Sequence, residues 1–267
     1  MNRFADRPPE RLISSRSHPL VKDLRRLAQD PGAYRKLGRI WLEGDHLCSA
    51  LLARGGVPRC AVVGASAWLQ PGPRALALRA PEVFVLDDGL LGEVSSLETP
   101  VSIGFLLDLP AGVDAGLRPD APSVVLDRLQ DPGNVGTILR SAAALGVRQV
   151  LALKGSAALW SPKVLRAGMG AHFALHLVEG LALADLEALN VPLVATSSHT
   201  EHALPALRLP APCAWVFGHE GQGVDAALLQ RCALTVRIPQ PGGEESLNVA
   251  AAAAICLYES ARQAMLG

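Results

Sequence analysis

The sequence lacks the features that mark secreted, metal-binding or membrane-spanning proteins. Its five cysteines are scattered, without a CxxC pair or a metal-ligand spacing, so we expect reduced thiols and no bound metal. The N-terminal residues, MNRFADRPPERL, contain no apolar core of a signal peptide. The apolar run at residues 249–258 is far shorter than the roughly 20 residues that cross a bilayer. Together these absences predict a cytoplasmic protein.

Two common nucleotide-binding signatures are missing as well. Residues 215–224, WVFGHEGQGV, form an apolar stretch that runs into a glycine-rich loop. No Gly-Lys-Ser/Thr follows this loop, which excludes a phosphate-binding P-loop. The spacing GxGxxG of a dinucleotide-binding fold is also absent.

Charge is distributed unevenly along a chain whose net charge is zero. Hydrophobic residues make up 49% of the 267 residues and charged residues 19%, which is ordinary for a globular protein. Residues 1–40, however, hold ten Lys and Arg against four Asp and Glu. Such a basic segment favours contact with a polyanion, and a solvated helix face is the simpler alternative.

The spacing of apolar residues divides the chain into two domains joined by a linker. Residues 18–27, HPLVKDLRRL, have apolar and cationic positions spaced as in an amphipathic helix. Residues 110–123 are rich in Pro, Gly and Ala and predict an interdomain linker. The other elements expected in the first domain, residues 1–109, are a strand at 40–42, a helix at 44–53, and strands at 60–63 and 82–86.

Strands and helices alternate over the second domain, residues 124–267. This alternation predicts an α/β fold, in which a parallel sheet is covered by helices on both faces. The last helix has an alanine-rich face, which is typical of close helix packing and could face a second subunit. The expected strands span residues 124–126, 149–153, 174–177, 191–196, 213–217 and 234–238, and the expected helices span 135–145, 162–167, 183–189, 225–231 and 247–265.

Polar residues follow the first strand of this second domain, in LDRLQDPGNVGTILR (126–140). Asn134 and Arg140 lie six residues apart on either side of Gly136, so both could border one crevice at the carboxyl end of the strand. The alternative for Asn134 is that it caps the helix, because its side-chain oxygen can accept hydrogen bonds from free backbone N–H groups.

Two later segments also place polar residues after strands. In FGHEGQG (217–223), Glu220 is the one acid of a loop whose glycines let the backbone approach a ligand, although glycines also mark plain turns. In IPQPGGEESLNV (238–249), Ser246 and Asn248 flank Leu247 at the start of a helix, where a single cap would suffice. The loop acids Glu244 and Glu245 are expected to be solvated.

In this order and spacing, the three segments resemble the signature motifs of the SpoU (TrmH-type) family of RNA 2′-O-ribose methyltransferases, in the SPOUT superfamily. Asn-x-Gly-x-x-x-Arg matches at 134–140, FGxEGxG at 217–223 and IPxxGxxxSLNV at 238–249. SPKVLRAGMGAHF (161–173) is similar too, with Gly168 where Ser or Ala is commoner. SSRSHPLVKDLRRL (14–27) and YRKLGRIWLEGDHL (34–47) resemble the family's small L30e-like substrate-binding domain.

The resemblance implies a SPOUT-type parallel sheet with a deep C-terminal trefoil knot, a homodimer, and transfer of a methyl group from S-adenosylmethionine to a ribose 2′-hydroxyl of RNA. The residues implied to line the adenosine site are Thr196, Gly218, Ile238 and Leu247. The cations implied to meet RNA phosphates, which supply affinity without sequence information, are Lys22, Arg25, Arg26, Arg35 and Lys36.

The resemblance also implies catalytic roles. Asn134, Ser246 and Asn248 would orient the ribose and phosphate, and Glu220 would hold Arg140, fix the motif loops or act in catalysis. Arg140 is the family's proposed catalytic residue, sometimes described as the general base. A guanidinium is effectively never deprotonated in proteins, so we favour an electrostatic role on an RNA phosphate or on the developing alkoxide.

Ribosomal RNA, and 23S rRNA in particular, is the favoured substrate because the chain has a separate first domain. This choice of substrate rests on analogy with rRNA methyltransferases. Transfer RNA is the alternative substrate. A non-catalytic RNA-binding protein of the same fold is a third reading, but such a protein would be expected to lack Arg140, Asn134 or Ser246, and all three are present. A Rossmann-type methyltransferase would need a glycine-rich loop after its first strand and an acid after its second, and neither is evident.

Overall fold

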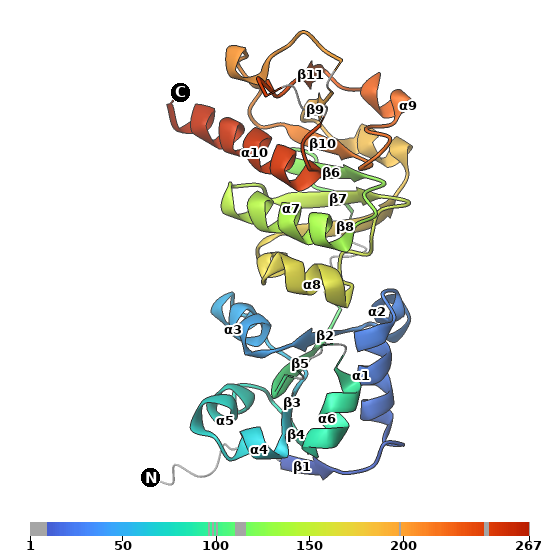
Figure 1. Cartoon of the computed structure of the whole chain (residues 1–267), viewed down its shortest axis with the longest axis vertical. Coiled ribbons are helices and arrows are strands. Elements are labelled where there is room, and N and C mark those ends of the chain that lie inside the picture. Colours follow the sequence, from blue (N-terminus) through green and yellow to red (C-terminus); the bar gives the residue numbers. More distant parts are fainter. Residues whose placement is uncertain are drawn as a thin grey trace. The chain divides into compact units, whose positions relative to one another are not determined.

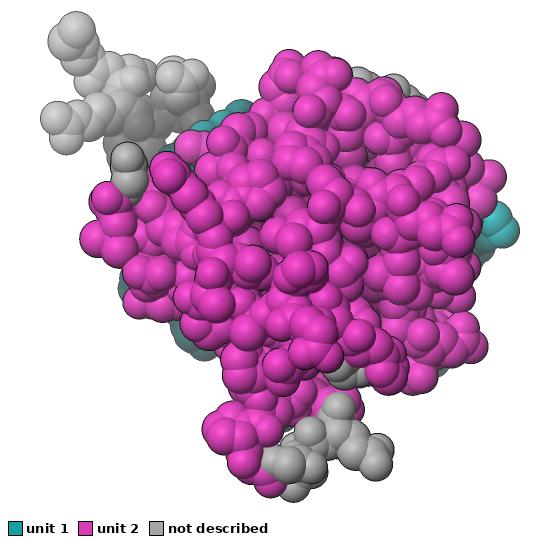
Figure 2. All heavy atoms as spheres, turned by 90° about the horizontal axis from the view of Figure 1, so that it is seen from above, with its two compact units in different colours: residues 1–110, 160–173 teal, residues 111–159, 174–267 magenta. Residues whose placement is uncertain are grey.

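The computed structural model describes residues 10–266 apart from residues 96, 98, 100, 110–115, 198 and 243–245. Its helices and strands are labelled in Figure 1. The chain forms two compact units: unit 1 comprises residues 1–110 and 160–173, and unit 2 comprises residues 111–159 and 174–267 (Figure 2). Part of the predicted linker and the loop acids Glu244 and Glu245 lie outside the described residues.

Unit 1 contains a five-stranded mixed sheet in the order β1-β4-β3-β5-β2. β1, β4 and β3 run parallel, whereas β5 pairs antiparallel with both β3 and β2. The three strands predicted for this part of the chain are confirmed, and β1 and β5 are additional. The strands are β1 (Glu10–Ile13), β2 (Arg39–Glu43), β3 (Cys60–Gly64), β4 (Val83–Leu86) and β5 (Ile103–Asp108).

The predicted amphipathic helix of unit 1 is α1 (Pro19–Gln29). It begins at Pro19, where His18 Nδ1 accepts a hydrogen bond from the Leu20 N–H at 3.2 Å. Its apolar side faces the core and buries Val21, Leu24, Leu27 and Ala28. The remaining helices of the unit are α2 (Ala33–Leu37), α3 (Asp45–Ala53), α4 (Ala65–Trp68), α5 (Pro71–Ala77), α6 (Asp88–Val94) and α8 (Pro162–Gly168).

Helix α8 packs against strand β2 of unit 1, although about 120 residues of sequence separate them. Arg166 of α8 lies 3.7 Å from the carboxylate of Glu43, which is 8% exposed. A buried carboxylate needs a nearby cation, so this ion pair anchors residues 160–173 within unit 1. The helix predicted at residues 162–167 is therefore present, and its packing partners lie in the first sheet.

Unit 2 is built on a six-stranded parallel sheet in the order β11-β9-β10-β6-β7-β8. The predicted parallel α/β arrangement is confirmed. Because all strands point the same way, the loops after their carboxyl ends meet along one edge. The strands are β6 (Ser123–Asp127), β7 (Gln149–Leu153), β8 (His176–Leu181), β9 (Leu193–Thr196), β10 (Ala214–Gly218) and β11 (Leu234–Val236).

Helices cover both faces of this sheet, as the alternation predicts (Figure 1). On one face lie α7 (Pro132–Ala144) and α10 (Val249–Leu266), and Trp215 Nε1 donates a hydrogen bond to Ser260 Oγ of α10 at 2.8 Å. On the other face, Leu186 of a 3₁₀ helix, η3 (Leu183–Ala188), and Leu228 of α9 (Ala226–Leu229) join one apolar core. That core receives the alternate strand residues Val125, Leu151, Leu193 and Val216.

Several predicted boundaries are wrong. The helix predicted at 183–189 is a 3₁₀ helix, the one at 225–231 is a single turn, β8 starts two residues late, and β11 stops at Val236. Helix α7 begins earlier than predicted because Asp131 Oδ1 accepts the Asn134 N–H at 2.7 Å. Asp131, not Asn134, is therefore its cap. Asn248 does cap α10, since its Oδ1 accepts the N–H of Ala250 at 2.9 Å.

Within the described ranges, no helix combines the length and the hydropathy needed to cross a membrane. The same part of the chain contains no group of three or more His, Cys, Asp and Glu side chains placed to bind a metal ion.

Candidate active site

A cavity of about 570 Å³ opens at the carboxyl edge of the unit 2 sheet. Its size lies within the range of small-molecule binding sites. The ends of β9, β10 and β11, the loops that follow them and the first turns of α10 form its walls. The lining residues are Thr196, Ser197, His199, Gly218, His219, Glu220, Gly221, Gln222, Gly223, Val224, Leu229, Val236, Arg237, Ile238, Gln240, Ser246, Leu247, Asn248, Val249 and Ala252.

The four residues predicted to bind the cofactor all line this cavity. Thr196 and Gly218 are the last residues of β9 and β10, Ile238 follows β11 by two residues, and Leu247 directly precedes the cap of α10. They meet because the carboxyl ends of parallel strands share one edge of the sheet.

Gly218 has a steric reason to be glycine. A Cβ at this position would lie 2.2 Å from the Val224 backbone nitrogen and 2.3 Å from the carbonyl carbon of Gly223. The loop that leaves β10 therefore returns so closely that it leaves no room for a side chain. This close return lets the loop backbone wall the cavity.

Hydrogen bonds join three predicted catalytic residues, one from each motif. Asn248 Nδ2 donates to Asn134 Oδ1 at 3.0 Å, and Asn134 Nδ2 donates to Glu220 Oε1 at 3.3 Å. Both asparagine amides are thus fixed in orientation, since each is donor to one partner and acceptor of another. Ser246, the remaining motif residue, lines the cavity beside Asn248. The three segments singled out in the sequence therefore form one site.

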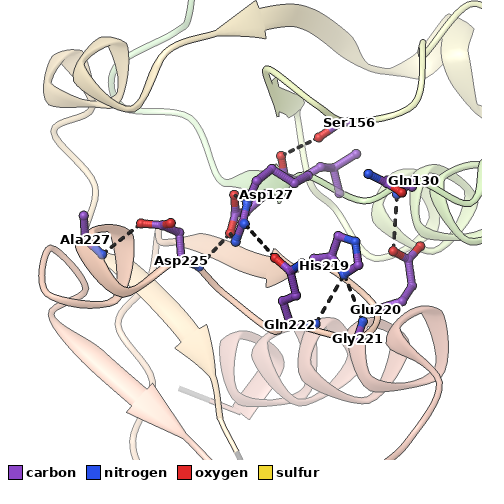
Figure 3. A network of polar contacts seen from close by, with 11 residues as sticks. Asp127, Gln130, Ser156, His219, Glu220, Gly221, Gln222, Asp225 and Ala227 are labelled. Carbon is purple, nitrogen blue, oxygen red and sulfur yellow. Dashed lines mark hydrogen bonds and ion pairs between the residues drawn. The ribbon is translucent and has the colours of Figure 1, made fainter.

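Glu220 holds the loop after β6. Its carboxylate accepts hydrogen bonds from the backbone N–H groups of Asp131 at 3.1 Å and Gln130 at 3.3 Å, the latter drawn in Figure 3. Burial alone would raise the pKa of Glu220, but its own backbone N–H, those of Asp131 and Gln130, and the Asn134 amide together lower the pKa below its ordinary value. Glu220 is therefore an ionised hydrogen-bond acceptor. Of the roles considered, the contacts are those of a residue that fixes the motif loops.

Arg140 is not brought to this cavity. It is exposed on α7 and is absent from the cavity lining. Its side chain forms no hydrogen bond or ion pair with any described residue, so Glu220 does not hold it. Six helical residues turn the side-chain direction by roughly 240° relative to Asn134 and advance it by about 9 Å. Neither Arg140 nor Asn134 lines this cavity, so the expectation that both border one crevice at the strand end stays a prediction.

A second polar network, missed by the sequence analysis, lies next to the cavity (Figure 3). Asp127, the last residue of β6, is 2% exposed and forms an ion pair with Arg128, whose Nη1 donates to Gln222 Oε1 at 3.1 Å. Asp127 Oδ2 also accepts the Asp225 N–H at 2.7 Å. An adjacent Asp-Arg pair at a strand end was the available signal, but the partners in the glycine-rich loop are 94 or more residues away in sequence.

The sequence analysis also missed Arg237. It is the one Lys or Arg among the described residues that line the cavity. Its Nε donates to the Thr200 carbonyl oxygen at 3.2 Å, which fixes the guanidinium at the cavity wall. A cation one residue before the IPxxG segment was the only sign of it in the sequence.

The sequence also matches the family model of the SpoU rRNA Methylase family over residues 121–258, which is more than half of the chain. The chain belongs to the SpoU methylase family. The matched region contains all three motif segments and all the lining residues of the cavity. The family inferred from the motifs is confirmed.

Relatives of this SpoU-family chain match it along most of its length. It is 34% identical to an uncharacterized tRNA/rRNA methyltransferase of Synechocystis sp., over 94% of this chain and 93% of the relative. It is 31% identical to the 23S rRNA (guanosine(2553)-2′-O)-methyltransferase RlmP of Bacillus subtilis, over 92% of this chain and 97% of the relative. The SpoU methyltransferase AviRb from Streptomyces viridochromogenes, solved in complex with the cofactor AdoMet, has a TM-score of 0.83 and 26% identity and covers 94% of this chain and 99% of its own.

The predicted RNA-binding cations of this SpoU-family chain lie on two helices of unit 1. On α1, Lys22 and Arg26 are exposed, whereas Arg25 is half-buried and its Nη2 lies 3.0 Å from the carboxylate of Glu93. On α2, Arg35 and Lys36 are exposed, and the Arg35 guanidinium lies 4.9 Å from the ring centre of Tyr34. Lys22, Arg26 and Lys36 present their charge to solvent, whereas Arg25 is held by Glu93, whose carboxylate also contacts Arg16.

Proposed function

We propose that this SpoU-family protein transfers a methyl group from S-adenosylmethionine to a ribose 2′-hydroxyl of RNA, with 23S ribosomal RNA as the favoured substrate. The observation that carries the proposal is the hydrogen-bonded line of Asn248, Asn134 and Glu220, which joins the three motifs at the mouth of the cavity. The names of the relatives support both the substrate and the methyl donor: RlmP is a 23S rRNA 2′-O-methyltransferase, and AviRb was solved with AdoMet.

The cavity residues fit S-adenosylmethionine. The side chains of Val224, Val236, Ile238 and Leu247 provide apolar walls for a flat adenine ring. Thr196 and the backbone around Gly218 provide hydrogen-bonding groups for the ribose, and the crowding at Gly218 brings that backbone close. When bound, the cofactor supplies a methyl group on a sulfonium, which is already a good leaving group.

The task left to the protein is to place the RNA ribose and to assist loss of its hydroxyl proton. Asn134, Asn248 and Ser246 orient the ribose and the adjoining phosphate. The two asparagines suit this role because their mutual hydrogen bond and the bond to Glu220 fix them before RNA arrives. Arg140 contributes positive charge toward an RNA phosphate or the developing alkoxide, and its guanidinium remains protonated throughout.

The protein acts as a homodimer in this proposal. Helix α10 carries exposed apolar side chains at helical spacing, including Ile255 at 41% and Tyr258 at 57% exposure. A soluble chain gains stability by covering such a stripe, and a second copy offers the same stripe in return. A dimer would also give the exposed Arg140 a site to act on, since it lies outside the cavity of its own chain.

Residues 1–109 are proposed as an L30e-like RNA substrate-binding domain, residues 110–123 as a linker and residues 124–267 as the catalytic domain. The exposed Lys22, Arg26 and Lys36 support the RNA-binding role of the first. A deep trefoil knot in the last part is proposed from membership of the SpoU family. A cytoplasmic location is part of the proposal, and the bacterial 23S rRNA methyltransferase among the relatives supports it.

The first experiment measures transfer of labelled methyl from S-adenosylmethionine to total RNA of a strain that lacks the protein, followed by mapping of the 2′-O-methyl sites. Label at one position of 23S rRNA is the expected result. Label in tRNA would retain the chemistry and replace the substrate. Cofactor binding without label in any RNA would instead favour a non-catalytic RNA-binding protein.

A further inference from the structure

The glycine-rich loop after β10, residues 218–225, is held along its length by the end of strand β6. At its start, Gly218 lies in register beside Asp127 across the parallel pair β10–β6. At its end, the Asp225 N–H donates to Asp127 Oδ2 at 2.7 Å. At its tip, Gln222 Oε1 accepts a hydrogen bond from Arg128 Nη1 at 3.1 Å. Asp127, the last residue of β6, and Arg128, which follows it, thus contact the start, the tip and the end of the loop.

Asp127 can serve as this anchor because its charge is compensated. A carboxylate that is 2% exposed is costly unless it is paired and hydrogen-bonded. The Arg128 guanidinium meets both of its oxygens, with Nε at 2.9 Å from Oδ1 and Nη2 at 3.1 Å from Oδ2. The bidentate pair leaves Nη1 free to reach the loop, which a lysine ammonium could not do from the same geometry.

The backbone conformation of Arg128 is one that only its surrounding contacts can maintain. Its φ is +56°, in the left-handed region that a non-glycine residue adopts at a cost. The residue therefore turns back so that its guanidinium lies against the carboxylate of its own neighbour. Such a conformation persists only where surrounding contacts hold it, and here these are the contacts to Asp127 and Gln222.

We propose that Arg128 is a positioning residue for the cofactor: with Asp127 it braces the loop 218–225, whose residues Gln222, Gly223 and Val224 wall the cavity. The inference rests on the proposed function for the identity of the ligand. Arg128 does not itself line the cavity, so it acts through the loop. Its removal should weaken cofactor binding and leave the chemical step nearly unchanged once the cofactor is saturating.

The left-handed backbone supplies a clean variant. Arg128→Gly removes the guanidinium and adopts the same φ without strain, whereas Arg128→Ala removes it and retains the strain. In Arg128→Gly we expect the dissociation constant of S-adenosylmethionine, measured by calorimetry, to rise about tenfold, and kcat at saturating cofactor to stay within about twofold. Arg128→Lys keeps the charge beside Asp127 but cannot bond both Asp127 and Gln222. Its affinity for S-adenosylmethionine should therefore lie between those of Arg128→Gly and the unaltered protein. Arg128→Asn, which also tolerates this backbone, replaces Arg128→Gly if that protein does not fold.

A double-mutant cycle separates bracing from a general loss of stability. Gln222→Ala should weaken binding in the same direction, and the double variant Arg128→Gly/Gln222→Ala should bind no worse than Arg128→Gly alone. The matched control is Arg231→Ala, which removes an arginine ion pair to Glu187 in the same unit, at 3.2 Å, from a residue outside the cavity. It should leave the cofactor affinity unchanged.

Hydrogen exchange tests the brace without the cofactor. The Gly223 N–H donates to the His219 carbonyl oxygen at 2.8 Å, and the Gly221 N–H donates to His219 Nδ1 at 3.0 Å. These amides should exchange faster in Arg128→Gly. Unchanged exchange would overturn the brace itself. The positioning role would be overturned by faster exchange with an unchanged cofactor affinity, or by additive effects in the double-mutant cycle. Failure of the unaltered protein to bind the cofactor would refute the proposed function instead.

Discussion

Replacement of Gly218 by alanine tests whether the returning loop shapes the cavity. The new Cβ would lie 2.2 Å from Val224 N, 2.3 Å from Gly223 C and 2.5 Å from Gly223 O, and all three are backbone atoms. No side-chain rotation can relieve these overlaps. Ordinary contact begins at 3.4 Å, so the backbone at Gly223 and Val224 must move by roughly 1 Å, away from the position in which it walls the cavity.

The expected magnitude follows from the cost of overpacking, about 1–3 kcal/mol. For a domain of this size, each kcal/mol lowers the melting temperature by about 2–4 °C, so Gly218→Ala should lower it by roughly 2–12 °C. Because the displaced atoms line the cavity, the dissociation constant of S-adenosylmethionine should rise about tenfold or more. Thermal unfolding followed by circular dichroism and calorimetric titration of the cofactor measure the two effects.

Gly221→Ala is the matched control, since it adds the same methyl group three residues further along the same loop. Its Cβ would meet only the His219 ring, at 3.8 Å, which is an ordinary contact. We expect its melting temperature to stay close to that of the unaltered protein; because Gly221 lines the cavity, this control is compared on stability. If Gly218→Ala binds the cofactor normally, or if both variants lose stability equally, then close backbone approach at Gly218 does not shape the site.

Four further predictions concern single residues of the proposed machinery. Arg140→Ala should lower kcat by roughly 10²–10³-fold and leave cofactor binding nearly unchanged, and loss of binding in calorimetry would indicate a structural role. Tyr258→Glu should convert a dimer into monomers in sedimentation velocity, because it places a charge in the exposed apolar stripe of α10; a monomeric unaltered protein would contradict the proposed interface. Lys22→Ala should weaken RNA binding uniformly across sequences and reduce the salt dependence by about one phosphate contact. Arg25→Ala should have a smaller effect, because the Arg25 side chain is half-buried and held in an ion pair by Glu93. Hydrogen bonds hold the pKa of Glu220 below its ordinary value, so the stability that Glu220 contributes is present above that ordinary value and is lost as the pH falls through the lowered pKa. The free energies of unfolding of Glu220→Gln and the unaltered protein should therefore converge in acid. A difference that stays constant with pH would exclude the linkage.

The architecture of unit 2 was largely predictable because its strands are short apolar runs that alternate with segments of helical periodicity. Residues 149–153 were predicted as a strand with the bounds that the structure shows. The order of the strands was not predictable from the residues, since pairing of β10 with both β9 and β6 depends on crossovers between distant segments. Edge strand β1 escaped prediction because it buries a single residue. Short elements such as α9 and η3 lack the length over which periodicity can define an end.

The residues of the cofactor site came from the resemblance to the SpoU family, and the fold explains why they meet. Thr196 and Gly218 end strands, which places them at the shared edge. The hydrogen bond between Asn134 and Asn248 spans 114 residues and required the fold. Arg128 was missed because the local sequence indicates neither its positive φ nor its bidentate ion pair with Asp127. A spacing of six within a helix does not return to the same face, so Asn134 and Arg140 point in different directions from α7.

The two carboxylates beside the cavity have opposite surroundings but the same role. Asp127 is buried and meets a guanidinium and one backbone N–H, whereas Glu220 is exposed and meets two backbone N–H groups and one amide. Each accepts hydrogen bonds from a loop other than its own: Asp127 from the Asp225 N–H, and Glu220 from the N–H groups of Asp131 and Gln130. The donors on Glu220 hold its pKa below the ordinary value, whereas a general base needs a pKa near the working pH. The arrangement therefore favours a site in which the carboxylates assemble the loops and the asparagine amides contact RNA.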